Sequence, residues 1–323
     1  MRRASPLRGL LASRRGRLGA LVLSMLAFVA VFADFIASDA PVLLWSEGRM
    51  SFLPAVTAPA RLDARQKQGV AAEPGAGRLA LWPLLRTEPP AAAPRAAPRG
   101  PERGHPLGTD AFGRDALVRL VHGTRTALVL GAAATALALL LGCLCGSAAG
   151  LLGGYPDRLI GRLTEVVGVF PAVVLIALVQ TLSHAPPLLT LVAIVALVRW
   201  AEVARLTRVL VLRALAEDWA EAARALGASY PRLAMSHIAP HVAPQVLVSG
   251  VFCFGSVVLT ETSLSFLGLG VPSEVASWGE MLSEVRWGAG PGLVLPAAAA
   301  LFVTLAGLYL LGDAVRETRA GSP

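Results

Sequence analysis

Long stretches without any charged side chain constrain this chain more than any other feature. No aspartate, glutamate, lysine or arginine occurs within 126–156, 166–198, 233–260 or 287–312. An α-helix crosses the ~30 Å hydrocarbon core of a bilayer with about 20 mostly apolar residues, so each stretch has room for at least one crossing. Glycine and proline, which recur in these stretches, are tolerated in membrane helices. We therefore predict a membrane protein.

Six membrane-spanning helices account for the apolar segments. Pro186 and Pro187 are expected to divide one stretch into two spans, and a further apolar run follows the arginine-rich start of the chain. That first run begins like a secretory signal peptide, but its apolar part exceeds the usual ~7–15 residues, so we interpret it as an uncleaved span. The predicted spans are 18–37, 125–152, 163–184, 188–208, 242–266 and 291–312.

Composition excludes several other classes of protein. Only 15% of the 323 residues are charged and 55% are hydrophobic, whereas soluble domains carry about 25% charged residues and disordered chains are poor in apolar ones. The net charge of +8 comes from scattered arginines without interleaved aromatic residues, so no nucleic-acid partner is predicted. The three cysteines fall inside predicted spans, which excludes a disulfide framework, and their spacing does not indicate a metal site.

Arginines beside the spans orient the predicted bundle. The segment 1–17 is rich in arginine, and so are the loop after the second span, the loop after the fourth span and the tail 315–323. A single orientation places all of these on one side, which the positive-inside rule identifies as the cytoplasm. Both termini are therefore predicted to be cytoplasmic, and 38–123 is predicted to lie outside.

The outer segment contains strand patterns and a linker. Two short strands are predicted on either side of Glu47 and Gly48, and a third at 79–85. The stretch 89–101 is rich in proline, alanine and arginine, a composition typical of an extended linker. We therefore expect a small outer subdomain that is joined to the second span by a linker.

Two further patterns flank and fill the second span. Thr109 or Asp110 is expected to cap a short helix that lies on the membrane surface before the span. Within the span, Gly142, Gly146 and Gly150 follow one another at intervals of four. Such a stripe of small residues lets another helix approach closely, because packing drives helix association in lipid.

The segment 208–240 has the most distinctive pattern of the chain. Acidic residues that include Glu221 precede the strong helix formers Ala222 and Ala223, and Gly227 can adopt the positive φ that ends a helix. One face is expected to carry Trp219, Ala223, Leu226 and Tyr230. Pro240 is expected to stop a second short helix before the fifth span. A loop as structured as this one is expected to dock onto another molecule.

These residues resemble a family motif. The sequence Glu221-Ala222-Ala223, then Gly227 and Pro240, resembles the EAA loop of permease subunits in bacterial ABC importers. Flanking motifs resemble the dipeptide and oligopeptide branch of that family: Leu-Gly-Thr-Asp and Gly-Arg-Asp within 107–115, Gly-Gly-x-x-Asp within 153–157, and Ser-Leu-Ser-Phe-Leu-Gly-Leu-Gly with Ser-Trp-Gly within 263–279. The resemblance covers about 105–315 and the first span. His237 and Ala239 depart from it, because the family usually has isoleucine and leucine at these two places before the proline.

The resemblance implies a fold and a set of partners. The fold would be an all-α, MetI-like polytopic permease in the bacterial inner membrane, with a small extracytoplasmic insertion. Its implied parts are a basic cytoplasmic N-terminus (1–17), a first span (18–37), an outer segment (38–123), a permease core (124–314) with its cytoplasmic coupling loop (208–240), and a tail (315–323).

The implied function is the channel-forming subunit of an ATP-driven importer for peptides or peptide-like solutes. Its partners would be a second permease in a heterodimer, cytoplasmic ATPase subunits, an extracytoplasmic solute-binding protein and membrane lipid. The resemblance assigns ATPase coupling to Glu221, Ala222, Ala223, Gly227 and Pro240. This chain lacks the phosphate loop Gly-x-x-x-x-Gly-Lys-Ser/Thr, so ATP and Mg²⁺ would be bound by the ATPase and no cofactor is expected here.

Three residues are candidates for the translocation path or for gating. Glu261 lies in the outer half of the fifth span, where a carboxylate must face the bundle or water; a path role and an internal hydrogen bond are both open. Glu202 and Arg199 could pair with each other or contact the path, and snorkelling near a helix end is the structural alternative. Pro171 bends the third span, as in many transporter cavities, although a purely structural kink is the alternative.

Two other functional classes are alternatives to the permease. A self-contained secondary transporter or channel is the main alternative; inverted repeats would favour it, and the sequence shows no convincing repeat. An intramembrane hydrolase is a poor interpretation, because neither Gly-x-Ser-x-Gly nor His-Glu-x-x-His occurs. We therefore expect a transport subunit without catalytic or metal-binding residues.

Overall fold

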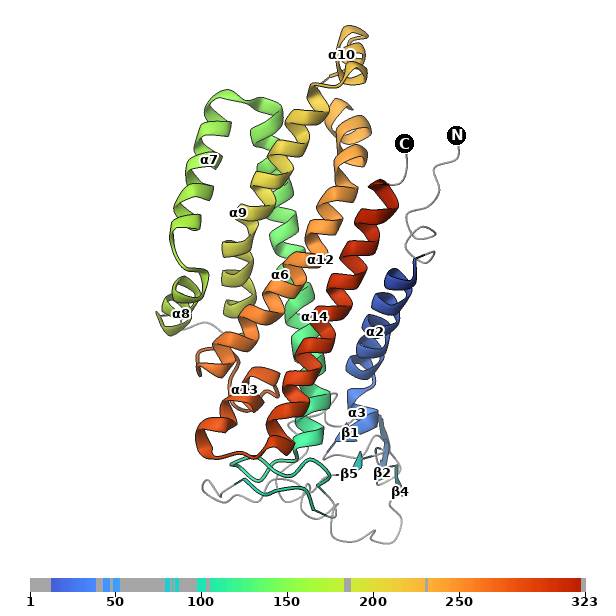
Figure 1. The fold of residues 1–323 in the computed structure, drawn as a ribbon, viewed down its shortest axis with the longest axis vertical. Coiled ribbons are helices and arrows are strands. Elements are labelled where there is room, and N and C mark those ends of the chain that lie inside the picture. Colours follow the sequence, from blue (N-terminus) through green and yellow to red (C-terminus); the bar gives the residue numbers. More distant parts are fainter. Residues whose placement is uncertain are drawn as a thin grey trace.

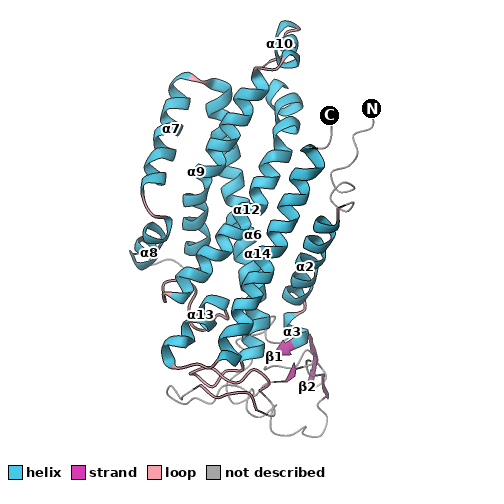
Figure 2. Ribbon diagram, viewed as in Figure 1, coloured by secondary structure: helices cyan, strands magenta, loops and turns pink. Residues whose placement is uncertain are grey.

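The computed structural model shows a bundle of long helices with short strands at one end (Figure 1, Figure 2). The residues that it describes are 13–38, 43–46, 49–52, 79–81, 83, 85–86, 98–102, 105–182, 187–229 and 232–320. Pro186, Tyr230, the turn at Glu47 and Gly48, and most of the predicted linker lie outside these residues. The mainly helical character confirms the predicted all-α class.

The helices follow one another along the chain with few interruptions. The long ones are α2 (Arg14–Val31), α6 (Ala116–Leu152), α7 (Gly154–Val169), α8 (Ala172–Leu182), α9 (Pro187–Leu215), α12 (Ala239–Phe266) and α14 (Pro291–Ala320). The short ones are α3 (Ala33–Ile36), α10 (Asp218–Ala225), the π-helix η2 (Leu233–Ile238), α13 (Trp278–Ser283) and the 3₁₀-helix η3 (Glu284–Trp287).

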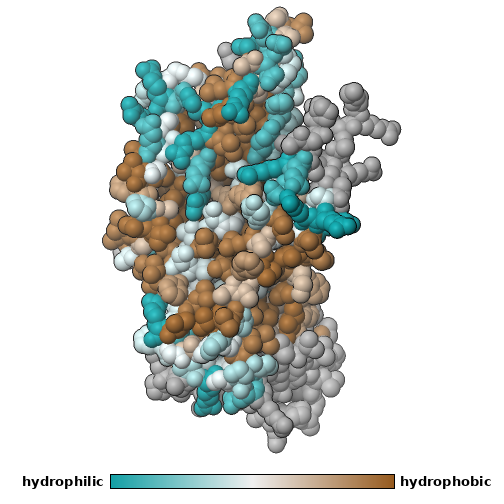
Figure 3. Space-filling view, viewed as in Figure 1, coloured by the Kyte–Doolittle hydropathy of each residue, from teal (hydrophilic) through white to brown (hydrophobic). Residues whose placement is uncertain are grey.

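Three of the described helices are long and apolar enough to cross a membrane. They are Ala116–Leu152, Leu233–Phe266 and Pro291–Glu317. Helices α7 and α8 pass the same test only together, and their bent arrangement fits a broken span or a re-entrant loop. By length and composition alone, α2 and α9 do not qualify, because α2 includes three arginines and charged residues interrupt α9 from Arg199 onward. Both nevertheless lie in the bundle where spans were predicted (Figure 1). Hydrophobic surface dominates the middle of the view in Figure 3, with hydrophilic residues gathered mainly toward the two ends.

The glycine stripe of α6 allows a close contact with another helix. A Cβ added at Gly142 would lie 2.5 Å from the Cβ of Val203, and one at Gly146 would lie 2.4 Å from the carbonyl oxygen of Ala204. Any larger side chain would therefore force α6 and α9 apart. The structure confirms that these glycines let another helix approach, and it identifies that helix as α9.

The predicted third span is broken rather than gently bent. In place of one helix over 163–184, α7 and α8 meet at Phe170 and Pro171 with a bend of 89°. Proline has no N–H to continue the first helix, and the Pro171 carbonyl instead accepts hydrogen bonds that begin α8. The predicted first span is likewise divided, at Phe32, between α2 and α3.

The start of α6 corrects another prediction. No separate surface helix precedes the second span within 105–124, because α6 runs from Ala116 without a break. Its cap is Asp115, whose carboxylate accepts from the backbone N–H groups of Leu117 (2.8 Å) and Val118 (3.0 Å). Thr109 and Asp110 are not the caps. The segment that begins at His105 is therefore a structured lead into α6.

The predicted hairpin is present at the end of the bundle where α6 begins. Strand β2 (Leu43–Ser46) pairs in antiparallel fashion with β3 (Arg49–Phe52) and with β4 (Leu79–Leu81). Strand β1 (Ala37–Ser38) pairs in parallel with β5 (Leu85–Arg86). The described strands therefore form a two-stranded and a three-stranded sheet beside α3 (Figure 2).

Candidate functional site

The segment predicted to be the coupling loop (208–240, called the coupling loop below) carries α10 (Asp218–Ala225) beyond the end of the helix bundle. Helix α9 continues to Leu215, after which α10 projects past the neighbouring helices (Figure 1). The start of α2 and the end of α14 lie at this same end of the bundle, where Arg15 contacts Asp313 at 3.1 Å and Glu317 at 2.6 Å. The loop is therefore the most protruding described element at the end that carries both termini.

Gly227 ends α10 as the sequence predicts. Its φ is +82°, and its N–H donates to the carbonyl of Arg224 at 2.9 Å, while the N–H of Ala228 donates to the carbonyl of Ala223 at 3.0 Å. This pair of bonds is a Schellman motif, which satisfies carbonyls at the helix end and requires a left-handed residue. The exposed turn after α10 is therefore fixed by hydrogen bonds.

Buried side chains attach the coupling loop to the bundle. Leu233 and Ile238 of η2 are almost fully buried and pack with Val211 of α9 and Val242 of α12. On α10, Ala220 is fully buried. Through this small core, α10 is packed against both α9 and α12.

The outward surface of α10 differs from the predicted one. Trp219 packs toward the bundle, with its ring centroid 5.6 Å from that of His241, but Leu226 points away and is 89% exposed. The prediction that Leu226 shares the Trp219 face is therefore wrong, since it lies at the helix end, where the chain turns. Glu221 and Ala222 are exposed beside it.

Pro240 does not end a helix. The chain is helical from Leu233 to Phe266 without a break, and Pro240 lies where the π-helix η2 gives way to α12, so a local change in the hydrogen-bonding pattern accommodates the proline. The expectation that this proline stops the second short helix is therefore wrong. Instead, Pro240 helps to line a groove of about 420 Å³ together with Trp219, Ser236, His237 and His241.

Glu261 lies inside the bundle, at the end opposite the coupling loop. Its side chain is almost completely buried in α12, and its Oε1 accepts hydrogen bonds from Ser265 Oγ and Ser277 Oγ, each at 2.8 Å. Ser277 also caps α13 by accepting from the N–H of Gly279. This geometry is the internal hydrogen bond that the sequence left open, and it joins α12 to α13.

Glu202 lies on the surface of the bundle, away from both ends of α9. Arg199 Nη1 contacts its carboxylate at 3.2 Å, and Arg199 Nη2 donates to Thr260 Oγ1 of α12 at 3.1 Å. The side chain of Glu202 is 60% exposed, whereas that of Arg199 is 17% exposed. Because both residues lie in the middle of α9, snorkelling to a helix end does not account for them.

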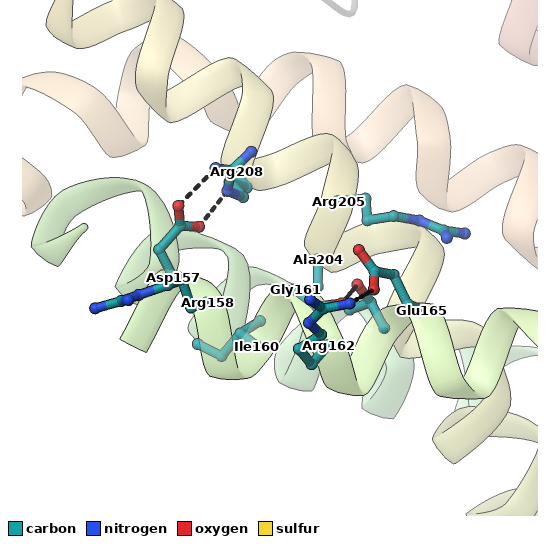
Figure 4. A pocket seen from close by; sticks show the side chains of 10 residues that line it. Asp157, Arg158, Ile160, Gly161, Arg162, Glu165, Ala204, Arg205 and Arg208 are labelled. Atoms are coloured by element: carbon teal, nitrogen blue, oxygen red, sulfur yellow. Dashed lines mark hydrogen bonds and ion pairs between the residues drawn. The ribbon is translucent and has the colours of Figure 1, made fainter. Parts of the chain in front are cut away.

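A charged cavity between α7 and α9 was not predicted from the sequence. It has a volume of about 470 Å³ (Figure 4). Asp157 of α7 holds Arg208 of α9 through two hydrogen bonds, one of them at 2.6 Å to Nη2. In the sequence, charged residues recur at every third or fourth position in the segments that form both helices. In either helix alone, however, this pattern is typical of an ordinary polar helix end and does not predict a cavity.

A second unpredicted feature is a buried ionic cluster beside α13, which we call the cap network. It consists of Asp110, Arg114, Arg119, Glu280 and Glu284. Asp110 accepts from Arg114 Nε at 2.6 Å, and Arg119 contacts Glu280 at 3.1 Å. Burial, and to a lesser extent the negative charge of Asp110, raise the pKa of Glu284. The network joins the lead into α6 to α13 and η3.

No group of three or more histidine, cysteine, aspartate or glutamate side chains is arranged to hold a metal ion within the described part of the chain. His237 and His241 lie one turn apart, but Trp219 packs against both rings. The end of the bundle that carries α10 therefore consists of an exposed loop, fixed by hydrogen bonds, over a small apolar core.

Comparison with known proteins places the chain among transport components. Residues 125–317 match the family described as the binding-protein-dependent transport system inner membrane component. The chain is 32% identical to the oligopeptide transport system permease protein OppC of Bacillus subtilis over 67% of this chain and 71% of that protein. It is 38% identical to OppC of Escherichia coli (67% and 72%) and 35% identical to its nickel transport system permease protein NikC (66% and 77%).

Proposed function

This chain belongs to the family of binding-protein-dependent transport system inner membrane components, and on that premise we propose how it works and with what. It is a permease subunit of an importer and a helical membrane protein. We infer that its solutes are peptides or peptide-like molecules, since the relatives named above include oligopeptide permeases. A self-contained secondary transporter is not supported by this family membership.

The coupling loop is the proposed contact with a cytoplasmic ATPase. The single observation that carries this proposal is the exposed end of α10, where Glu221, Ala222 and Leu226 face away from the bundle and the Gly227 turn is fixed. Because the turn is held by its own hydrogen bonds, it presents Leu226 to a partner in a preorganised position, which lowers the cost of binding. ATP and Mg²⁺ would then be bound by the partner, and this chain would be non-catalytic.

The proposed orientation follows from the end at which the loop lies. The arginine-rich start of α2 and the end of α14 are beside the coupling loop, and basic residues favour the cytoplasmic side. Both termini would then be cytoplasmic, and α13 with the short sheets would face outward, toward an extracytoplasmic solute-binding protein.

The proposed transport cycle is alternating access between this chain and a second permease subunit. Movement of the ATPase would displace α10, and through its small core α9 and α12, and so favour one of two bundle arrangements. The break at Pro171 makes α7 and α8 the least continuous part of the bundle, so we propose that they move relative to the rest. Glu202 would face the path, and Glu261 would hold α13 in place.

Co-purification with the ATPase tests the coupling loop. We expect Glu221→Arg to lose the ATPase subunits while the chain still inserts into the membrane, because the substitution reverses a charge at the proposed contact. Glu274→Arg, which changes an exposed glutamate at the opposite end, is the matched control and should retain them. Undiminished recovery of the ATPase with Glu221→Arg would contradict the proposal.

A further inference from the structure

The cavity between α7 and α9 is bordered by more positive than negative side chains. Four arginines and two carboxylates line it: Arg158, Arg162, Arg205, Arg208, Asp157 and Glu165. The floor between the two helices includes Gly161, where an added Cβ would meet nothing within 4 Å. The cavity is thus open space with an excess of two positive charges.

Ion pairing inside the cavity leaves two of the arginines available. Arg208 is held by Asp157. Arg162 contacts Glu165 at 3.2 Å, and the side chains of this second pair are well exposed. Among the described residues, neither Arg158 nor Arg205 has a carboxylate partner: Arg158 donates only to the carbonyl of Gly154 at 3.3 Å. Arginine presents a planar fork of donors that fits a carboxylate.

The surroundings of the cavity decide what kind of anion would reach it. Charged residues recur at every third position along α9: Arg199, Glu202, Arg205 and Arg208. The exposed carboxylate of Glu202 lies one turn further into the bundle than Arg205, and an exposed carboxylate opposite lipid tails would be costly. The part of α9 that exposes Glu202 and Arg205 therefore faces water or a partner subunit, so a phospholipid with its acyl chains against this part is disfavoured.

We propose that this cavity binds the carboxylate of the transported solute at the cytoplasmic end of its path, with Arg205 as the principal contact. The inference rests on the proposed function, because it takes the charged surface of α9 to border the path. The guanidinium of Arg205 forms charge-assisted hydrogen bonds to the carboxylate, and Arg158 adds attraction at the entrance. Exposure of both arginines to water keeps the binding weak enough for release.

Thiol labelling within the cavity tests the proposal in the assembled transporter in nanodiscs, without ATP. Gly161→Cys places a thiol on the cavity floor, and the parent chain with its three native cysteines gives the background. We expect the anionic reagent sulfonatoethyl methanethiosulfonate to label Cys faster than its trimethylammonium counterpart. Trialanine should slow this labelling about tenfold, whereas trialanine amide, which lacks the carboxylate, should not.

A second substitution assigns the effect to Arg205. Adding Arg205→Gln should remove the preference for the anionic reagent and raise the half-protecting concentration of trialanine about tenfold. Arg213→Gln, which changes an arginine of α9 outside the cavity, is the matched control and should leave both unchanged. Should Arg205→Gln fail to assemble, Arg158→Gln is expected to reduce the charge preference in the same direction.

Three results would overturn the proposal. Equal protection by trialanine and its amide would show that no carboxylate is recognised, and so would the absence of protection. Protection that requires phosphatidylglycerol in the nanodisc and is indifferent to peptide would assign the cavity to a lipid phosphate. The labelling needs no ATP-driven step. Undiminished recovery of the ATPase with Glu221→Arg would therefore contradict the proposed function without producing any of these three results.

Discussion

The two ends of the bundle present opposite solutions to holding a short helix. At one end, α10 is largely exposed, and its position depends on one glycine turn and a few buried alkyl groups. At the other end, α13 is enclosed: Trp278 is completely buried and donates to the carbonyl of Leu120 at 3.2 Å. The contrast teaches that α10 leaves most of its surface open, whereas α13 is fixed in register with α6, α12 and α14 by buried contacts.

The largest expected effect on stability comes from adding a side chain where α13 contacts α12. A Cβ added at Gly279 would lie 2.3 Å from the carbonyl oxygen of Thr262 in α12, and backbone cannot give way as a flexible side chain can. We expect Gly279→Val to prevent accumulation of monodisperse protein in detergent, as measured by size-exclusion chromatography. Gly161→Val, at a position with open space, should accumulate normally. Normal recovery of Gly279→Val would show that α13 is not confined.

A smaller loss of stability is expected when Glu261, the hydrogen-bond acceptor that joins α12 to α13, is replaced. Glu261→Ala leaves the buried hydroxyls of Ser265 and Ser277 without their acceptor, which costs about 1–3 kcal/mol for each unsatisfied group. We expect a clear fall in Tm, with Glu261→Gln intermediate because its amide oxygen still accepts. ATPase co-purification should be unaffected, which separates this end from the coupling loop. An unchanged Tm for Glu261→Ala would refute the assigned role.

A substitution at the exposed end should leave stability unchanged and weaken binding of the ATPase. Leu226→Asp alters a side chain that is 89% exposed, so we expect Tm to remain within about 1 °C of the parent. Apparent affinity for the ATPase should fall about tenfold or more, as expected for loss of one well-buried apolar contact. Titration of the ATPase against permease in nanodiscs measures this change. A drop in Tm without loss of affinity would mean that Leu226 stabilises the chain itself.

The smallest expected effect concerns pH and the cap network. The pKa of Glu284 is raised, chiefly by burial, so the folded chain holds this proton more tightly than the unfolded chain does. The resulting stability is complete below the unfolded pKa of about 4.3 and is lost as pH rises through the raised value. Glu284→Gln should therefore raise Tm slightly at neutral pH and flatten the pH dependence above about pH 4.3. A lower Tm at neutral pH would contradict this sign.

The sequence predicts elements better than their junctions. The charge-free stretches located the long helices, and the Gly227 turn and the glycine stripe were predicted correctly, because each depends on local chemistry. The right-angle break at Pro171 and the passage of a helix through Pro240 could not be predicted, since a proline is compatible with a kink, a break or a first turn. Neighbouring elements decide among these outcomes.

The candidate site was predictable only where its residues are contiguous. The coupling loop lies within one segment, so its motif is visible in the sequence. The cavity between α7 and α9 joins Asp157 to Arg208, and the cap network joins Asp110 to Glu280. Pairings of this kind across long separations depend on the packed bundle, and no single helix carries their signal.

The glycine contact between α6 and α9 has a mechanical consequence. Since Val203 and Ala204 sit directly against the α6 backbone, we expect α6 and α9 to move together. Helix α9 leads into α10 at one end of the bundle, and α6 begins at the lead segment beside α13 at the other. If the proposed ATPase displaces α10, both helices would tilt over their whole length, and the displacement would reach the opposite end of the bundle.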